Sequence, residues 1–239
     1  MNMIQELKRL LDNKISEETL VLHGTSIQAI FELGIRGSLP SGKIRVREDG
    51  NIEDIDSYGL WFTPVTSKLK GRGYTWLEDE EKDRDGCIES ATSYAKGVAF
   101  IDYLAEKLNC RTAEAYSAIF YDWSLNWKEV GEEYWKKLKE KMEGLDVKTN
   151  LRQMAVLHHY ANKRNGVIVE ADESIFELPC NQLLCDTESI FVECPGGLDI
   201  RYIRGMKLLG PVEEKLMGRF LNGKLKYRGF MTTYAGGGL

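Results

Sequence analysis

The sequence predicts an α+β fold, and the order of its apolar segments carries that prediction. Helix-like and strand-like stretches are mixed in the first hundred residues, and a long region with helical periodicity follows. The chain then changes to consecutive short apolar runs typical of strands, which read "GVIVEA", "SIFELP", "ESIFVEC" and "DIRYIRGMKLLG". A doubly wound parallel sheet would need regular alternation of strand and helix, which this order lacks.

The first hundred residues divide into helices and strands around a turn-rich segment. Thr25 or Ser26 can cap the start of the second helix, and Gly34 is expected to end it. Asp49-Gly50 is a good turn sequence. The expected elements are helices over 3–12, from Thr25 or Ser26 to about 34 and 88–108, and strands over 19–23 and 59–64.

The middle of the chain, about residues 101–160, reads as a helical block. Helical patterns cover residues 112–143 and 150–162. No linker separates this block from its neighbours, so we expect one domain over residues 1–239 with the block as an insertion. A lid, an acceptor platform and a dock for an antitoxin are three roles that the sequence leaves open.

Composition is that of a globular protein and argues against several classes. The chain is 43% hydrophobic and 29% charged, and its net charge of −5 does not favour nucleic-acid binding driven by bulk charge. No apolar stretch approaches the roughly 20 residues of a membrane span, and the start does not resemble a signal peptide. The five cysteines include no CxxC pair, so neither a metal site nor a disulfide framework is expected. We therefore expect a cytoplasmic protein with no membrane partner.

His23 and Gly24 follow an apolar run and precede a predicted helix. The histidine is either a structural residue bonded to a backbone carbonyl or a ligand-binding group, because imidazole both donates and accepts near neutral pH. Gly24 lets the backbone approach a planar ligand closely, and a helix that begins at Thr25 or Ser26 adds free amide donors. Together these residues favour a small socket for a polar ligand.

Trp61 and Tyr94 are candidate stacking surfaces for such a ligand. Trp61 lies in the strand-like "GLWFTP", and Tyr94 lies among small residues in "SATSYAKG". Small neighbours leave room for a planar ring to stack, although both aromatic residues can equally belong to the core.

Glu188, at the start of the strand-like "ESIFVEC", is the leading candidate for a catalytic acid. A carboxylate in this position can accept a hydrogen bond from a substrate hydroxyl or stabilise a developing cation. An exposed strand-end glutamate is the alternative, and Glu193 and Glu170 compete for the catalytic role.

The order of these motifs resembles that of the ADP-ribosyltransferase superfamily. The similar subgroup has a His-Tyr-Glu triad and includes the poly(ADP-ribose) polymerases, diphtheria-type toxins and many bacterial and phage-defence toxins. The resemblance covers residues 20–100 and 165–210 and leaves the helical block unmatched. It implies split antiparallel β-sheets that form a cleft for NAD. The matching residues are His23 with Gly24, Trp61, Tyr94 and Glu188.

The resemblance also implies a role for each residue. His23 would hold a ribose hydroxyl of NAD, the Gly24 backbone would pair with the carboxamide, and Thr25 would be a further contact of NAD. Tyr94 would stack on the nicotinamide, with Trp61 as a second wall. Glu188 would bind the 2′-hydroxyl and stabilise the oxocarbenium-like sugar, a contact typically worth about 3–4 kcal/mol of barrier.

The function implied is mono-ADP-ribosyl transfer from NAD, as a substrate, to a macromolecule with release of nicotinamide, as in a toxin. An NAD glycohydrolase and a non-catalytic module that binds ADP-ribose or a nucleotide are the alternatives. An antitoxin is a further candidate partner.

Two basic stretches, residues 157–165 and 215–230, favour RNA or DNA over protein as the acceptor. Basic residues interleaved with aromatic ones can hold phosphates and stack bases, although a solvated amphipathic surface is the alternative. His158 and His159 are adjacent on a predicted helix and face different directions, so they do not suggest a metal pair. The second stretch contains Lys215, Arg219, Phe220, Lys224, Lys226, Tyr227, Arg228 and Phe230.

Overall fold

The computed structural model describes residues 2–41, 44–46, 52–54, 59–69, 82–108, 164–178, 184–185, 190–225 and 227. Its α-helices are α1 (Met3–Asp12), α2 (Ile27–Arg36), α3 (Thr66–Leu69), α4 (Arg84–Leu108) and α9 (Pro211–Leu221). Its 3₁₀ helices are η1 (Glu173–Glu177) and η2 (Ile200–Tyr202). Its strands are β1 (Val21–Thr25), β2 (Ser38–Leu39), β3 (Ile44–Val46), β4 (Ile52–Asp54), β5 (Gly59–Pro64), β6 (Val167–Ala171), β7 (Leu184–Cys185), β8 (Ile190–Glu193), β9 (Leu198–Asp199) and β10 (Ile203–Leu208).

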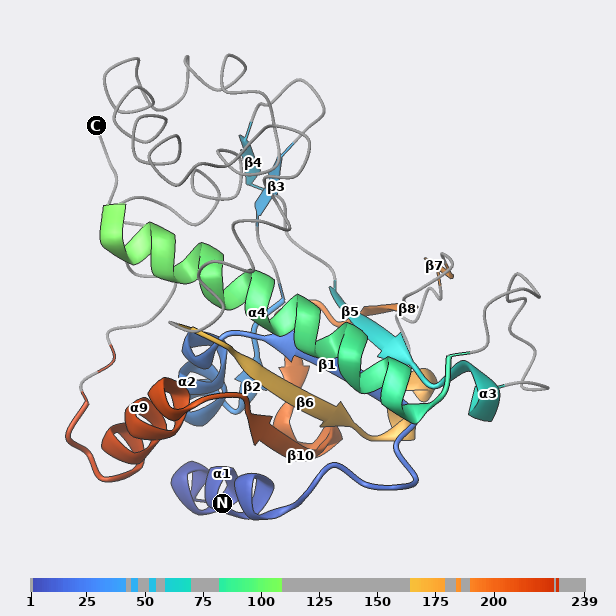
Figure 1. The fold of residues 1–239 in the computed structure, drawn as a ribbon, viewed down its shortest axis with the longest axis horizontal. Helices are drawn as coiled ribbons and strands as arrows, with labels where there is room; N and C mark the ends of the chain where they lie inside the picture. The colour runs from blue at the N-terminus through green and yellow to red at the C-terminus, as the bar shows by residue number, and fades with distance from the viewer. Residues whose placement is uncertain are drawn as a thin grey trace.

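Six of these strands form one open sheet in the order β10-β6-β1-β5-β8-β7 (Figure 1). Neighbouring strands are antiparallel throughout this sheet. Two short ladders, β2 with β9 and β3 with β4, complete the strand pairing of the described residues. The α+β class expected from the order of apolar segments is therefore confirmed.

Strand β5 divides the sheet into two ladders. Its C-terminal end pairs with β1, through Leu22 opposite Thr63 and Val21 opposite Pro64. The remainder of β5, from Gly59 to Phe62, pairs instead with β8. Strand β1 pairs with β6 along its whole length. Beyond Leu22, β1 therefore continues beside β6, whereas its described ladder with β5 has ended.

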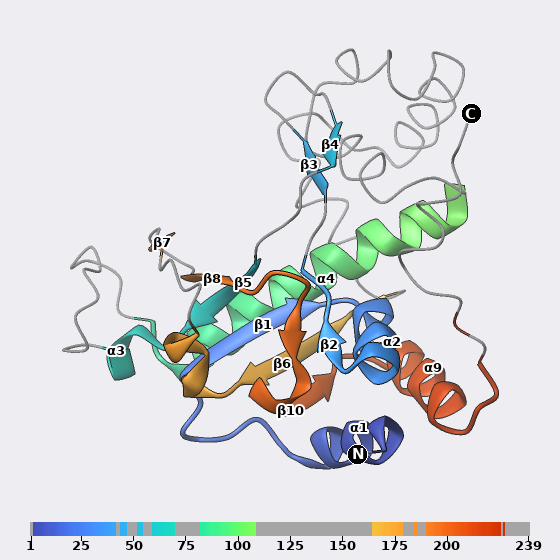
Figure 2. The same cartoon turned by 180° about the vertical axis from the view of Figure 1, so that it is seen from behind.

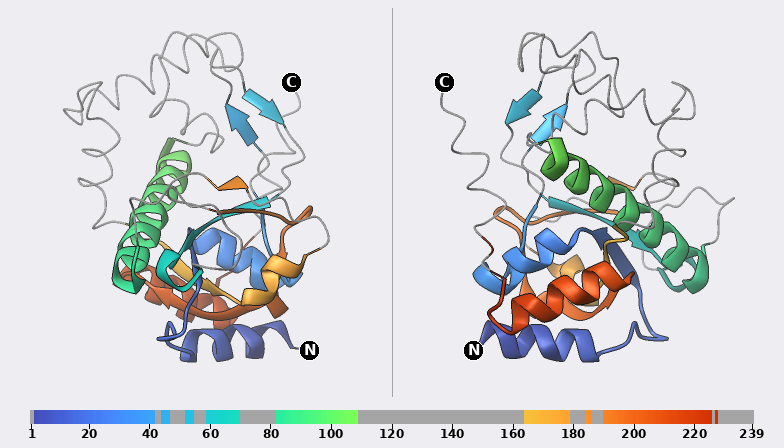
Figure 3. Two further views of the ribbon diagram at one scale, coloured as in Figure 1. Left: turned by 90° about the vertical axis from the view of Figure 1, so that its right-hand side faces the viewer. Right: turned by 60° about the vertical axis from the view of Figure 1, so that its left-hand side comes forward.

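Helices cover both faces of the sheet. Helix α4 crosses one face, where Ala91 and Cys87 pack on Leu22 and Ile168 (Figure 1). Helices α1, α2 and α9 lie on the opposite side, as the views in Figures 2 and 3 show, and their apolar residues join the main core. The sheet is thus the middle layer, and β1 is buried between the two helical layers.

Helix α2 continues past Gly34, where the sequence predicted its end. A Cβ at Gly34 would lie 2.4 Å from Leu7 Cδ1 and 2.9 Å from Phe220 Cε1, so this glycine permits close packing of α1, α2 and α9. The helix instead ends at Gly37, which adopts φ 76° and donates its N–H to the carbonyl of Leu33. Ser26 caps the start by accepting from the N–H of Ala29.

Most other expected elements are present with shifted ends. The helix expected over 3–12 is confirmed as α1, the strand expected over 59–64 is confirmed as β5, and α4 starts four residues before the expected 88. The segment "SIFELP" is not a strand but lies largely in η1, because Asp172 Oδ1 accepts from the N–H of Ser174 and starts a helical turn. The helical patterns over 112–143 and 150–162, the Asp49-Gly50 turn and most of the insertion lie outside the described residues.

Candidate functional site

His23 is the third residue of β1 rather than the residue that ends it, and its ring reaches towards β5. Its Nδ1 lies 2.6 Å from the carbonyl oxygen of Trp61. Because a carbonyl only accepts, the Nδ1 carries the proton and the Nε2 keeps its lone pair. Burial lowers the pKa of His23, and the bond to the Trp61 carbonyl opposes that shift only in part. The side chain is therefore neutral at pH 7, with the Nε2 as a hydrogen-bond acceptor.

The bond between His23 and Trp61 joins the two ladders of the sheet. Trp61 belongs to the part of β5 that pairs with β8, while His23 belongs to the part of β1 that pairs with β6. The imidazole also packs against Phe62, with ring centroids 5.4 Å apart. It lies where β1 and β5 part, at the edge of both ladders.

Gly24 lets helix α4 approach β1 at this same point. A Cβ on Gly24 would lie 2.3 Å from the Ala91 carbonyl oxygen, 2.5 Å from the Ala95 nitrogen and 2.9 Å from the Tyr94 Cβ. Real Cβ atoms do not approach backbone so closely, so only glycine fits without moving the helix. Gly166, with φ 79°, meets the Ala95 carbonyl oxygen at 2.4 Å by the same test. The structure therefore brings the start of Tyr94 against the strand residue that follows His23.

Tyr94 and Trp61 are both half-exposed, unlike the apolar residues around them. Each has 48% of its surface exposed, whereas Ala91 and Ala95 on the same helix are fully buried. The Trp61 ring rests on Phe191, with centroids 5.1 Å apart. The site thus has a neutral imidazole, a glycine backbone and two large exposed rings.

The start of helix α2 does not add the open amide donors that the sequence suggested. Thr25, Ser26 and Ile27 are buried, with 5%, 1% and 1% of their surface exposed. Thr25 pairs with Val167 in the sheet, and the Ser26 side chain occupies the capping position of the helix. These residues take part in the sheet and in the helix cap, and the expected contact of Thr25 with a cofactor stays a prediction.

The three candidate acids lie in different places. Glu188 is outside the described residues. Glu193 is opposite Gly59 at the end of β8 and lines a cavity of about 210 Å³ beside η2. Glu170 lies opposite Leu22, whereas His23 lies opposite Val169. Successive residues of a strand point to opposite faces, so the side chain of Glu170 is on the other face of the sheet from that of His23.

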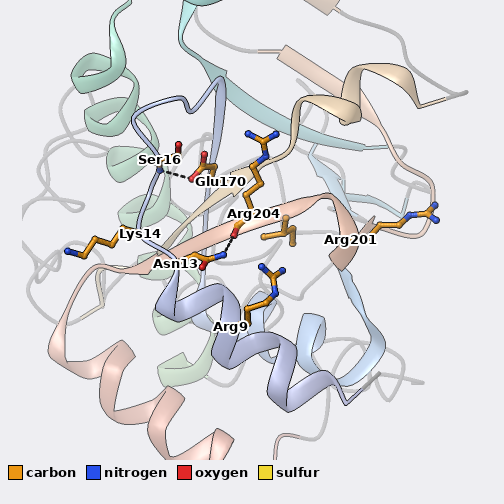
Figure 4. A pocket seen from close by; sticks show the side chains of 8 residues that line it. Arg9, Asn13, Lys14, Ser16, Glu170, Arg201 and Arg204 are labelled. Atoms are coloured by element: carbon orange, nitrogen blue, oxygen red, sulfur yellow. Dashed lines mark hydrogen bonds between the residues drawn. The ribbon is translucent and has the colours of Figure 1, made fainter.

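A larger cavity, of about 500 Å³, surrounds Glu170 and is lined mainly by basic and polar residues (Figure 4). Motif reasoning missed most of it, because its residues come from the end of α1, the segment after it and β10. Arg201 and Arg204, three residues apart in "DIRYIRGMK", were the available indication, since they concentrate positive charge in a short segment. The lining residues are Arg9, Asn13, Lys14, Ser16, Glu170, Arg201, Ile203 and Arg204.

The aromatic residues of the basic stretch 215–230 do not form a base-stacking surface where they are described. Phe220 stacks on Phe31 with ring centroids 4.6 Å apart, and Tyr227 contacts the same ring at 5.3 Å. These rings pack in the core, while Lys215, Arg219 and Lys224 are exposed. His158, His159, Lys226, Arg228 and Phe230 lie outside the described residues.

Two kinds of feature are absent from the described part of the chain. It contains no helix that is long and apolar enough to cross a membrane, and no cluster of three or more His, Cys, Asp or Glu side chains arranged for a metal. Comparisons of the chain with protein-family models, with curated proteins and with solved structures found no match to any of them.

Proposed function

We propose that the chain is an NAD-dependent mono-ADP-ribosyltransferase whose nicotinamide site lies where β1 and β5 part. The observation that carries this proposal is His23, a neutral imidazole with an unprotonated Nε2, which is followed in β1 by Gly24, the residue that lies against Tyr94 of α4. An acceptor nitrogen, a bare strand backbone and an exposed ring are the three groups that a ribosyl-nicotinamide needs.

Each group has a defined contact with NAD. The His23 Nε2 accepts a hydrogen bond from a ribose hydroxyl, which the Nδ1–H could not do because it is committed to Trp61. The half-exposed Tyr94 ring stacks on the nicotinamide, and Trp61 supplies a second apolar wall. The Gly24 backbone pairs with the carboxamide, in the part of β1 that lies beyond its described ladder with β5.

Glu188 is the proposed catalytic acid. It precedes β8 by two residues, and β8 pairs with the part of β5 that holds Trp61. Its carboxylate accepts a hydrogen bond from the 2′-hydroxyl of the nicotinamide ribose and stabilises the positive charge that develops on the sugar. The bond from ribose C1′ to the pyridinium nitrogen breaks, and its electron pair leaves with neutral nicotinamide. The acceptor nucleophile then forms the new bond at C1′ and loses a proton.

A macromolecular acceptor, RNA or DNA before protein, is part of the proposal. Support comes from the exposed basic residues Lys215, Arg219 and Lys224, which present positive charge on and after α9. Phe220 and Tyr227 pack against Phe31, so they are not available to stack on bases. The three basic residues would therefore contribute contacts to phosphates. We propose this activity for a toxin that acts in the cytoplasm and is inhibited by an antitoxin.

The test follows labelled NAD incubated with the purified chain and with cellular RNA, DNA or protein. Release of nicotinamide and label in one polymer would support the transferase. Glu188→Gln should lower release by about 10²–10³-fold, whereas Glu193→Gln should not, because Glu193 is at the far end of β8. Val98→Ala, at an exposed position of the same helix, is the matched control for Tyr94→Ala.

Two results would replace this function with its alternatives. Nicotinamide release with label only in free ADP-ribose would identify a glycohydrolase. Binding of NAD or ADP-ribose with no release under any condition would identify a binding module. Absence of both binding and release would contradict the proposal as a whole.

A further inference from the structure

The cavity around Glu170 is separate from the site at His23. It lies between the end of α1, the segment over residues 13–16 and β10 (Figure 4). It is open to solvent and has a volume of about 500 Å³, which leaves room for a small ligand. The lining is mainly polar, so a polar ligand is indicated.

Glu170 provides the strongest indication of a ligand. Only 1% of its surface is exposed to solvent, and its Oε2 accepts a hydrogen bond from the backbone N–H of Ser16 over 2.9 Å. Its Oε1 has no hydrogen-bond partner among the described residues. A buried carboxylate oxygen without a donor is unfavourable, so this atom is suited to a hydrogen-bond donor that a ligand brings.

The charges around Glu170 restrict what that ligand can be. Four cationic side chains and one carboxylate line the cavity. Arg204 lies beside Glu170 and pairs with Asp172 at 2.5 Å, and the Arg9 guanidinium points towards the same space from α1 (Figure 4). Lys14 and Arg201 extend outward on opposite sides. Arg9 is also paired with Glu6, and Arg201 with Asp199. A ligand that offers both a hydrogen-bond donor and an anionic group suits this set, because a simple anion would leave the Glu170 Oε1 without a donor.

We propose that this cavity binds a phosphorylated ribose. A sugar hydroxyl donates to the Glu170 Oε1, and the phosphate pairs with Arg9 and with Lys14, which is exposed and long enough to turn inward. The same unit occurs in mononucleotides and at the phosphorylated end of an RNA strand. None of His23, Trp61 and Tyr94 lines this cavity, so its binding can be measured apart from the NAD site.

Calorimetric titration of the full chain with ribose 5-phosphate tests the proposal, with ribose and inorganic phosphate as half-ligands. Ribose 5-phosphate should bind at least about tenfold more tightly than either half, because a hydrogen bond to a charged group and an ion pair both contribute. Equal affinity for ribose 5-phosphate and inorganic phosphate would overturn the proposal, since the carboxylate would then have no role. Titrations with AMP and with a 5′-phosphorylated oligoribonucleotide show whether the phosphorylated ribose comes from a mononucleotide or from an RNA end. Tighter binding of either one than of ribose 5-phosphate supports the site.

Three substitutions separate the contacts. Glu170→Gln can keep the bond from Ser16 while removing an acceptor oxygen, and should weaken ribose 5-phosphate binding about tenfold without changing phosphate binding. Arg9→Gln should weaken both, and Lys96→Gln, on α4 and not among the residues that line the cavity, should weaken neither. Tyr94→Ala should leave this binding intact even where it abolishes NAD binding, so the two sites can fail separately. Unchanged binding in Arg9→Gln would contradict the site even if Glu170→Gln failed to fold.

Discussion

His23 donates its Nδ1 proton to the backbone carbonyl of Trp61 over 2.6 Å, and this side-chain bond stands where the ladder between β1 and β5 has stopped. The bond fixes the tautomer, so the outward chemistry of the ring depends on the Nε2 alone. Several consequences for stability and binding can be measured directly.

The stability contributed by neutral His23 should be lost in mild acid. Burial lowers the pKa of His23 below 6.5 in the folded chain, so the unfolded chain binds the proton first as the pH falls. The free energy of unfolding should be at its full value above pH 6.5 and should decrease below it, by up to about 1.4 kcal/mol per pH unit. Urea unfolding between pH 7.5 and 5 measures the slope.

The variant His23→Gln separates the contribution of His23 to this pH dependence from the contributions of the other histidines. The glutamine amide can still donate to the Trp61 carbonyl, but it does not titrate. The difference in unfolding free energy between the two proteins should therefore change with pH only below 6.5. Parallel curves for the two proteins would show that His23 is not held neutral by its burial.

Gly24→Ala should destabilise the chain through helix α4. The added Cβ meets backbone atoms at 2.3 and 2.5 Å, which a side-chain rotation cannot relieve. The expected cost is about 1–3 kcal/mol, with NAD binding reduced because Tyr94 moves with the helix. Chemical denaturation and calorimetry measure the two effects.

Gly218→Ala is the matched control for that substitution. Gly218 lies inside α9, and a Cβ there meets nothing within 4 Å. Replacing a helical glycine by alanine at an open position should stabilise by about 0.5–1 kcal/mol. Equal destabilisation by both substitutions would mean that the close approach of α4 to β1 is not what Gly24 protects.

Tyr94→Ala and Trp61→Ala should separate binding from stability. Both rings are half-exposed, so their removal should cost less stability than removal of a core aromatic, which costs about 3–5 kcal/mol. Loss of one stacking partner should weaken NAD binding by about tenfold, whereas Tyr94→Phe, which keeps the ring, should retain most of it. Titration with NAD, alongside thermal unfolding, gives both quantities; a fall in stability with unchanged binding would assign the rings to packing.

Cys87 and Cys194 should resist alkylation in the folded chain. Burial raises the pKa of Cys87 to about 12 and that of Cys194 to about 11, so neither forms the reactive thiolate at neutral pH. Cys87 also donates its thiol to the Thr63 carbonyl. Mass spectrometry after iodoacetamide treatment should find both sites unmodified in buffer and modified in denaturant. Rapid modification of Cys87 in buffer would show that α4 opens from the sheet.

Local sequence patterns predicted the elements whose cause is local. The helix over residues 3–12, strand β5 and strand β6 follow from apolar periodicity, which does not depend on distant parts of the chain. The end of α2 was misplaced because Gly34 and Gly37 look alike in sequence. Only the packing of Leu7 and Phe220 on Gly34 shows that the first glycine serves close contact and the second serves the turn.

The candidate sites show the same difference between features with local causes and features that depend on distant parts of the chain. His23, Gly24 and Tyr94 were proposed because their neighbours in sequence carry the pattern, and the structure places Tyr94 against Gly24, the residue after His23. The burial of Ser26 and the basic cavity at Glu170 were not found, because both arise from segments far apart in sequence.

The packing of α1 against β10 has a consequence for synthesis on the ribosome. Leu7 and Leu10 belong to the same core as Ile203 and Met206, which follow them by almost two hundred residues. During translation the first helix therefore emerges long before the surface that will cover its apolar side. The nascent chain must keep that amphipathic segment from aggregating until β10 has left the exit tunnel, so this layer folds only after β10 has been made.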